Sequence, residues 1–153
     1  MPLKDKNPLP PEFPRVKGKY QMTEEWSLHL PEEFLRRFED AALVLWNKHF
    51  TMWITVWNND KNESVKRRAD ELEDERNPES FDATRETKEG LTYLSYRLDE
   101  SEQGESTPSQ PAFYTWTIGK HGQLQMAMYF DAKKDVEMAK GILMSVREKP
   151  ARK

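Results

Sequence analysis

The side chains best suited to binding chemistry lie in the segment TMWITVW, residues 51–57. These residues alternate strictly, with Met52, Ile54 and Val56 on one side and the threonines and tryptophans on the other. Such alternation of β-branched and aromatic residues predicts a β-strand. The first side is typical of a core. The second can stack on rings and form hydrogen bonds, so we expect it to face water, a covering segment or a partner.

Two other predicted strands carry residues of the same kind. Trp46 ends the preceding apolar run, and Met126 and Met128 lie in a later one. Tryptophan is enriched at binding hot spots, and methionine adapts its shape to different partners. We therefore predict five partner-binding residues: Trp46, Trp53, Trp57, Met126 and Met128. The alternative is that they form the core of a sheet covered by helices on both faces.

The sequence contains no recognisable catalytic constellation. The histidines, His29, His49 and His121, lack the spacing of a helical zinc site, and there is no cysteine. No Gly-x-Ser-x-Gly element occurs that would present a serine nucleophile. Paired carboxylates lie in polar segments, where solvated surface is the simpler interpretation. We accordingly expect no enzyme activity, no metal and no cofactor.

Composition limits the classes of partner. Of the 153 residues 36% are hydrophobic and 33% charged, and the net charge is −3. A general nucleic-acid binder needs a basic face that neutralises phosphates, so we expect no nucleic-acid partner. There is no run of 18 apolar residues and no secretory signal, which predicts a cytoplasmic protein without membrane insertion. Between Asp60 and Glu105, 15 acidic residues accompany 8 basic ones, which predicts an acidic, solvated flank.

The elements that must position these residues follow in the order strands, helix, strands, helix. Alternation predicts strands at 25–30, 43–46, 50–57, 81–87, 91–98, 113–118 and 123–130. Pro31 predicts a short helix or turn after the first strand. Helices are predicted from Asn58–Asp60 to about residue 75 and over 132–147. We infer an α+β fold, in which an antiparallel β-sheet packs against helices.

The chain divides into an arm, one domain and a tail. Five prolines among residues 1–19 predict an extended proline-rich arm without helix or central strand. The simpler interpretation is a tail in solvent. The alternative is a strap in which Leu9, Phe13 and Val16 lie over the body. We assign the arm, a single α+β domain and the tail to residues 1–19, 20–148 and 149–153.

Two segments carry a resemblance to a known fold. The segment WSLHLPEEF, residues 26–34, reads as a strand that ends in Leu-Pro before a turn, and a strand hairpin follows. After the later hairpin, MYFD at 128–131 leads into a closing amphipathic helix. In this order of elements the chain resembles the PsbP-like fold. That fold is an α/β/α sandwich that includes the DcrB-like proteins and the effector-associated chaperones of bacterial type VI secretion.

The resemblance implies a bacterial protein-binding domain and not an enzyme. We expect an adaptor or chaperone of a secreted effector, or an immunity-type partner of a toxin, with a homodimer left open. A chaperone would use the tryptophan side, and an immunity protein the acidic flank. One alternative is a small-ligand-binding protein or enzyme with a pocket between sheet and final helix, near Tyr93, Tyr129 and His121. Another is a structural domain that associates with itself.

Overall fold

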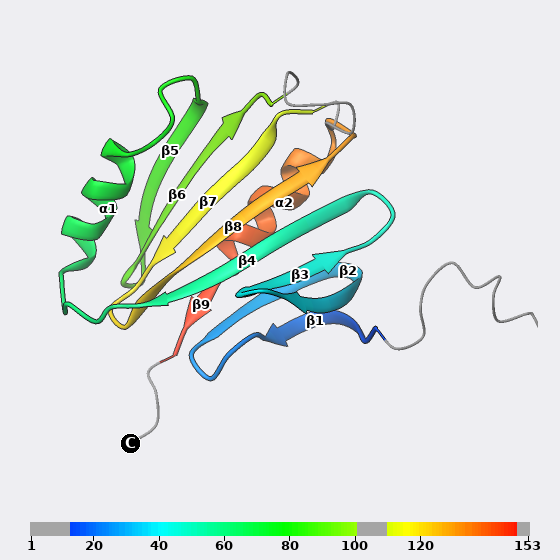
Figure 1. The fold of residues 1–153 in the computed structure, drawn as a ribbon, viewed down its shortest axis with the longest axis horizontal. Coiled ribbons are helices and arrows are strands. Elements are labelled where there is room, and N and C mark those ends of the chain that lie inside the picture. The colour runs from blue at the N-terminus through cyan, green and yellow to red at the C-terminus, as the bar shows by residue number, and fades with distance from the viewer. Residues whose placement is uncertain (1–12, 101–109, 150–153) are drawn as a thin grey trace, which may run out of the picture.

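The computed structural model describes residues 13–100 and 110–149, and this part forms one antiparallel sheet with two helices (Figure 1). The strands are β1 (Arg15–Gln21), β2 (Trp26–Glu39), β3 (Ala42–Trp46), β4 (Phe50–Asn58), β5 (Phe81–Lys88), β6 (Leu91–Leu98), β7 (Ala112–Ile118), β8 (Gly122–Phe130) and β9 (Arg147–Glu148). The helices are α1 (Val65–Asp74) and α2 (Asp135–Met144). The prediction of an antiparallel sheet with helices is confirmed.

Two four-stranded meanders build the sheet. β1 to β4 are neighbours in chain order, β5 to β8 likewise, and β4 pairs with β8 to join the halves. β9 adds a short pairing at the start of β2. The register between β4 and β8 places Trp53 opposite Ala127 and Ile54 opposite Met126. Because opposed residues share a face, this one pairing decides how the surfaces of the two meanders combine.

The two helices lie on opposite faces of the sheet. α2 lies behind the sheet in Figure 1 and packs Ala139 and Ile142 into the main core. α1 packs Ala69 against Leu94 and Ile118 on the other face. Each helix has ten residues, and α1 lies mainly over β6 and β7. The described residues therefore show an antiparallel sheet with two short helices, and the face that carries α1 stays open over β3, β4 and β8.

The main core lies between the sheet and α2. β4 and β8 supply side chains that are at most 2% exposed, namely Met52, Ile54, Leu124, Met126 and Met128. Trp26, Leu28 and Leu30 at the start of β2 pack into the same cluster. Burial of apolar surface stabilises a fold by about 25 cal/mol per Å². This face therefore drives folding, and its residues are not accessible to a partner.

The predicted helix or turn after Pro31 is wrong, because β2 is continuous through this region. Phe34 and Leu35 are 1% and 3% exposed and alternate between the two faces of the sheet. Pro31 lies between Leu30 and Phe34, where the pairing of β2 with β1 is irregular. A proline has no N–H to donate, and such an irregularity is where a strand tolerates one. Burial on both faces outweighs the local turn signal.

Part of the segment predicted as an arm belongs to the sheet. Residues 15–19 lie in β1, which is an edge strand, so the body begins at Arg15 and not at residue 20. Phe13 and Val16, two residues of the alternative strap, contact the body. Leu9 and the rest of residues 1–12 lie outside the described residues. Of the predicted tail, only Lys149 is described, and its amide donates to the carbonyl of Glu25.

α1 begins later than the sequence predicts. Its N-cap is Ser64, whose hydroxyl accepts a hydrogen bond from the amide of Arg67. Asn59, in the predicted start, instead fixes the preceding loop. Its amide group donates to the carbonyls of Glu63 and Lys120. An asparagine can satisfy either role, and here contacts outside the helix decide.

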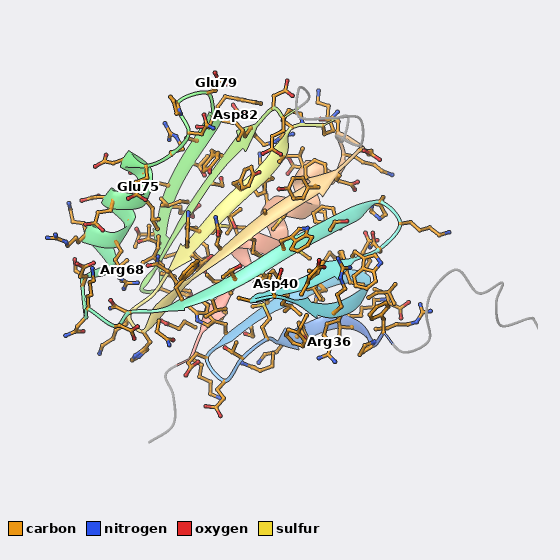
Figure 2. All side chains as sticks on the ribbon, in the orientation of Figure 1. Arg36, Asp40, Arg68, Glu75, Glu79 and Asp82 are labelled. Carbon is orange, nitrogen blue, oxygen red and sulfur yellow. The ribbon has the colours of Figure 1, made fainter. Side chains whose placement is uncertain are left out.

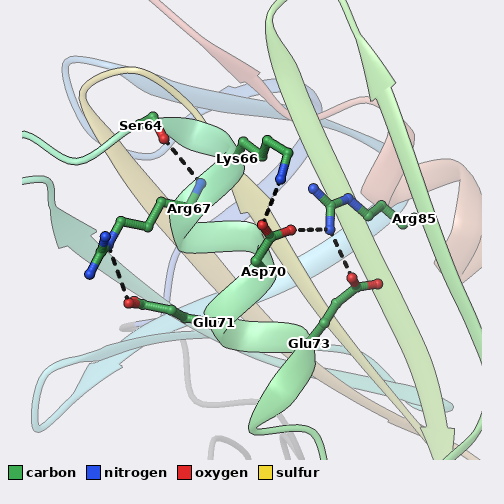
Figure 3. Close-up of polar contacts among 7 residues, drawn as sticks. All are labelled: Ser64, Lys66, Arg67, Asp70, Glu71, Glu73 and Arg85. Carbon is green, nitrogen blue, oxygen red and sulfur yellow. Dashed lines mark hydrogen bonds and ion pairs between the residues drawn. The ribbon is translucent and has the colours of Figure 1, made fainter.

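Ion pairs orient α1 against β5 (Figure 3). Arg85 of β5 donates to Asp70 and to Glu73, both at 2.8 Å. Lys66 also binds Asp70, at 2.9 Å, and these two cations hold the pKa of Asp70 below its ordinary value. Exposed ion pairs stabilise a protein little. These pairs therefore only supplement the apolar packing of Ala69, which holds α1 on the sheet.

Arg68 is the buried polar anchor of α1. It is 6% exposed and donates to the carbonyl oxygens of Gly119 and Gly122, at the two ends of the β7–β8 turn. Burial lowers the pKa of the guanidinium, which nevertheless stays charged at neutral pH. From the other side, the carboxylate of Glu148 accepts from the amide of His121 in the same turn. The turn is thus held between α1 and β9.

We predict that Arg68→Met lowers the free energy of unfolding by about 2–3 kcal/mol, because buried carbonyls lose a charged donor. Urea denaturation of the purified chain measures this. Arg67→Met, an exposed neighbour on the same helix, is the matched control and should stay within about 0.5 kcal/mol of the original chain. Equal losses for the two variants would contradict the anchoring role.

Candidate functional site

The open part of the sheet gathers the aromatic side chains predicted for binding. Trp53 lies opposite Val44 of β3 and Ala127 of β8, and Trp46 lies opposite Thr51. The registers therefore define one surface, which we name the aromatic face. Its residues are Arg37, Trp46, Thr51, Trp53, Thr55, Trp57, Tyr96, Tyr114, Trp116, Gln123, Gln125, Ala127 and Tyr129.

Exposure along the aromatic face increases toward the end of β4. Trp46 and Trp53 are partly buried, whereas Trp57 is 50% exposed. Ala127, the smallest side chain of the face, lies between Trp53 and Tyr114 and is not fully buried. Since adjacent strands are about 4.8 Å apart, the backbones that carry these two rings are roughly 10 Å apart. A partner's side chain can therefore reach the surface between them.

Arg37 holds the tryptophans on the β2 side of the face. Its guanidinium lies 4.7 Å from the ring centroid of Trp46 and 5.7 Å from that of Trp53. Glu39 accepts two hydrogen bonds from it, at 2.8 and 3.0 Å. Cation–π contacts of this kind fix ring positions, and the carboxylate fixes the cation. Both rings are thus presented in one arrangement before any partner binds.

Hydrogen-bonded tyrosines form the opposite side of the face. The hydroxyl of Tyr114 donates to Glu100 at 2.5 Å and lies 3.1 Å from the hydroxyl of Tyr129. Tyr96 stacks on Tyr114 with ring centroids 5.4 Å apart. Burial raises the pKa of all three hydroxyls, and the bond to Glu100 raises the pKa of Tyr114 further. These groups remain protonated at neutral pH, so they suit stacking and hydrogen bonding and not proton abstraction.

A groove of about 430 Å³ continues the aromatic face between β4 and α1. Trp57 and Gln123 line it from the sheet and Leu72 from the helix. Figure 2 shows this face toward the viewer, with Arg68 and Glu75 on the α1 side. We name it the acidic groove, because its ionisable lining residues are Asp60, Lys61, Glu63, Arg68, Glu71 and Glu75.

The acidic groove keeps a net negative charge after its ion pairs are considered. Four carboxylates and two cations line it. Arg67, at the rim, lies 3.5 Å from both Glu63 and Glu71, and counting it still leaves more carboxylates than cations. The part of the predicted acidic flank nearest α1 therefore lies beside Trp57, the most exposed tryptophan of the face.

The structure brings together three of the five predicted site residues. Trp46, Trp53 and Trp57 lie on the aromatic face. Met126 and Met128 are fully buried in the main core on the opposite side of the sheet, and we correct this part of the prediction. The physical reason is the alternation of side chains along β8. The methionines of β8 point toward α2, whereas its glutamines, Ala127 and Tyr129 lie on the side of the tryptophans.

Sequence reasoning missed the polar half of the face. The segment 122–130 alternates as strictly as 51–57, so the sequence does signal that Gln125 and Tyr129 lie on the side opposite the methionines. Their position beside Trp53 depends on the pairing of β4 with β8. Arg37 carried no such signal, since its segment was predicted as a helix or turn.

His49 forms a second polar cluster, which has the composition of a catalytic group. Its Nδ1 lies 3.0 Å from Asp135 and its Nε2 lies 2.9 Å from Glu32. Because carboxylates engage both ring nitrogens, neither is left to accept a proton from a substrate. His49 instead connects the β3–β4 turn to β2 and to the start of α2. Across the described ranges, no group of three or more His, Asp or Glu residues is arranged to hold a metal ion.

The three residues of the small-ligand alternative do not converge. Tyr93 is buried on the α2 side and donates to the carbonyl of Val146. Tyr129 belongs to the aromatic face, and His121 is exposed in the β7–β8 turn. A cavity of about 370 Å³ does lie between the sheet and α2, lined by Arg97 and Phe113 of the sheet and by Val136 and Lys140 of the helix, but Tyr93, Tyr129 and His121 do not line it.

The chain matches no family model and no curated protein. The PsbP-like resemblance accordingly stays a prediction.

Of the helices in the described residues, none has the length and apolar character needed to cross a membrane.

We predict that protonation of His49 stabilises the fold. Hydrogen bonds to Asp135, and then to Glu32, raise the pKa of His49 above its ordinary 6.5 in the folded chain. This stabilisation is complete below that ordinary value and is lost as the pH rises through the higher, folded-state pKa. The urea midpoint of the original chain minus that of His49→Gln should therefore shrink as the pH rises from 6.

His29→Gln is the matched control, since His29 is an exposed histidine on β2. Its difference from the original chain gives the background effect of removing one histidine, which is subtracted at each pH. A constant difference between the original chain and His49→Gln across this range would show that the carboxylate contacts of His49 do not depend on its charge.

Proposed function

We propose that this chain is a non-enzymatic protein-binding domain that captures a partner segment on the aromatic face. The acidic groove would select a basic residue of that segment. One observation carries the proposal: the half-exposed Trp57 borders a groove with four carboxylates and two cations. Tryptophans dominate binding energy at interfaces, while complementary charge gives specificity and fast association.

The side chains of the aromatic face favour a protein partner. Tryptophan and tyrosine provide large rigid contact areas and lose little conformational entropy on binding. Arg37 and Tyr114 are already held by Glu39 and Glu100, so a partner need not order them. Threonines and glutamines between the rings supply hydrogen bonds to a partner's backbone or side chains.

The spacing of the tryptophans points to an extended partner segment. Trp53 and Trp57 are four residues apart on β4, which corresponds to about 13 Å along a strand. A segment in extended conformation with apolar residues four positions apart would place one of them at each ring. A lysine or arginine beyond the second apolar residue would then reach the acidic groove.

Two biological roles are consistent with this proposal. An adaptor or chaperone of a secreted effector would depend mainly on the aromatic face, and an immunity-type partner of a toxin mainly on the acidic groove. Bacterial origin, a cytoplasmic location and a PsbP-like α/β/α sandwich belong to the same proposal. The placement of α1 and α2 on opposite faces supports the sandwich, although α1 covers only part of its face.

We predict that Trp57→Ser weakens peptide binding at least tenfold, because truncation of a hot-spot tryptophan removes about 2 kcal/mol or more. The measurement is a peptide-display selection on the immobilised full chain, followed by titration of enriched peptides. Those peptides should carry two apolar residues four positions apart and a nearby Lys or Arg. Phe38→Ser removes another exposed ring, 67% exposed on β2, and should leave the affinity unchanged.

Selection of no peptide would contradict the proposal, as would peptides that bind Trp57→Ser and the original chain equally. Unchanged urea midpoints would establish that Trp57→Ser acts on binding and not on folding.

We predict further that the double variant Glu71→Lys and Glu75→Lys reverses the charge preference. Enriched peptides should lose their basic residues and gain acidic ones, since the groove lining changes from net negative to net positive. Repetition of the selection on this variant measures the effect. Persistence of basic residues would show that the acidic groove does not contact the partner.

A further inference from the structure

The start of the described chain lies at one end of the aromatic face. Phe13 packs edge-on against Trp46, with ring centroids 5.2 Å apart. The next residue, Pro14, accepts a hydrogen bond from the amide of Arg36 and so continues the pairing of β1 with β2. Beside Trp46 lies a pocket of about 480 Å³, whose apolar lining comes from Phe34 and Leu35. The described chain therefore begins beside Trp46, at the margin of the aromatic face.

The sequence of those residues, MPLKDKNPLPPE, complements the aromatic face. Its prolines favour the polyproline II conformation, and aromatic-lined grooves are the surfaces that bind such segments. Leu9 lies among the prolines nearest Phe13, while Lys4 and Lys6 lie farther away. The order along the arm is thus apolar first and basic second. Along the aromatic face, the order from Trp46 is likewise tryptophans first and acidic groove second.

The length of the arm also matches the length of the aromatic face. In polyproline II conformation each residue advances about 3.1 Å, so Lys6 lies roughly 22 Å from Phe13. Along β4, the distance from Thr51, opposite Trp46, to Trp57 is about 20 Å. Because Phe13 precedes β1, which lies three strands from β4, the arm must also cross roughly 14 Å of sheet. The diagonal from Phe13 to Trp57 is then roughly 20–25 Å, so an arm on this path brings Lys6 close to the acidic groove. Leu9 and its neighbouring prolines would then lie over Trp46 and Trp53.

We infer that residues 3–12 dock in cis along the aromatic face, from Trp46 toward the acidic groove, and compete there with the partner segment. The docking stands on the contacts of Phe13 and the match in order and length. The competition rests on the proposed function. A tethered segment has an effective concentration in the millimolar range, so even a weak contact would occupy the face for much of the time.

The docking is tested by a nitroxide label on the single variant Asn7→Cys of the full chain, which contains no other cysteine. Amide signals of Thr51–Trp57 and Gln123–Tyr129 should broaden strongly. Those of Asp135–Met144 in α2, on the opposite face, should broaden much less. Equal broadening on both faces, or none, would overturn the inference.

Two controls separate docking in cis from its alternatives. In the labelled chain, Leu9→Ser together with Lys6→Glu should relieve the broadening, because it removes the apolar and basic contacts. Mixing labelled chain with unlabelled, isotope-enriched chain should leave the signals of the latter sharp. Broadening in the mixture would assign the arm to a second copy and overturn docking in cis.

The competition is tested with the display-selected peptides. They should bind the Leu9→Ser, Lys6→Glu variant about tenfold more tightly than the original chain, because the arm no longer occupies the face. Equal affinities would overturn the competition. If the label broadens the aromatic face but no peptide is selected, the proposed function is refuted and the docking of the arm stands. If peptides are selected but the broadening is not confined to the aromatic face, the docking is refuted and the proposed function stands.

Discussion

The pairing of β4 with β8 is the constraint on which the rest of the structure depends. It joins two meanders that are each local in sequence, and it runs from Phe50 opposite Phe130 to Asn58 opposite Gly122. A shift by one residue would turn every side chain of one strand to the other face. Buried methionine and isoleucine on one side make such a shift costly, since the main core would be lost. The core thus specifies the composition of the aromatic face without contacting it.

Polar contacts at the two ends of the β4–β8 pair hold the adjoining turns in fixed positions. At one end Arg68 and Glu148 hold the β7–β8 turn, and at the other His49 joins β2 to α2. The first of these anchors also fixes α1, which forms one wall of the acidic groove. The buried guanidinium of Arg68 thereby fixes the position of the acidic groove relative to the core. Because rings and carboxylates are held before binding, a partner loses less entropy in ordering them.

Local pattern and long-range burial disagreed at identifiable places. Alternation predicted the central strands, because half-buried strands have the same period wherever they pair. Pro31 gave a turn signal, yet Phe34 and Leu35 are buried on the two faces, so tertiary burial prevailed. Asn59 resembled a helix cap, and only the proximity of Lys120 shows why it serves the loop instead. Met126 and Met128 resembled binding residues in type, but their side of the strand carries the main core.

The sequence by itself determined two alternating strands, each with a core side and a side rich in rings or amides. It also determined an acidic segment over residues 60–105 and a proline-rich segment at residues 1–19. Only the tertiary structure decided that Trp53 adjoins Ala127, that α1 places carboxylates beside Trp57, and that Phe13 meets Trp46. The physical reason is that alternation follows from the geometry of a single strand, whereas strand partners and helix positions are selected by burial and hydrogen bonding across the whole chain.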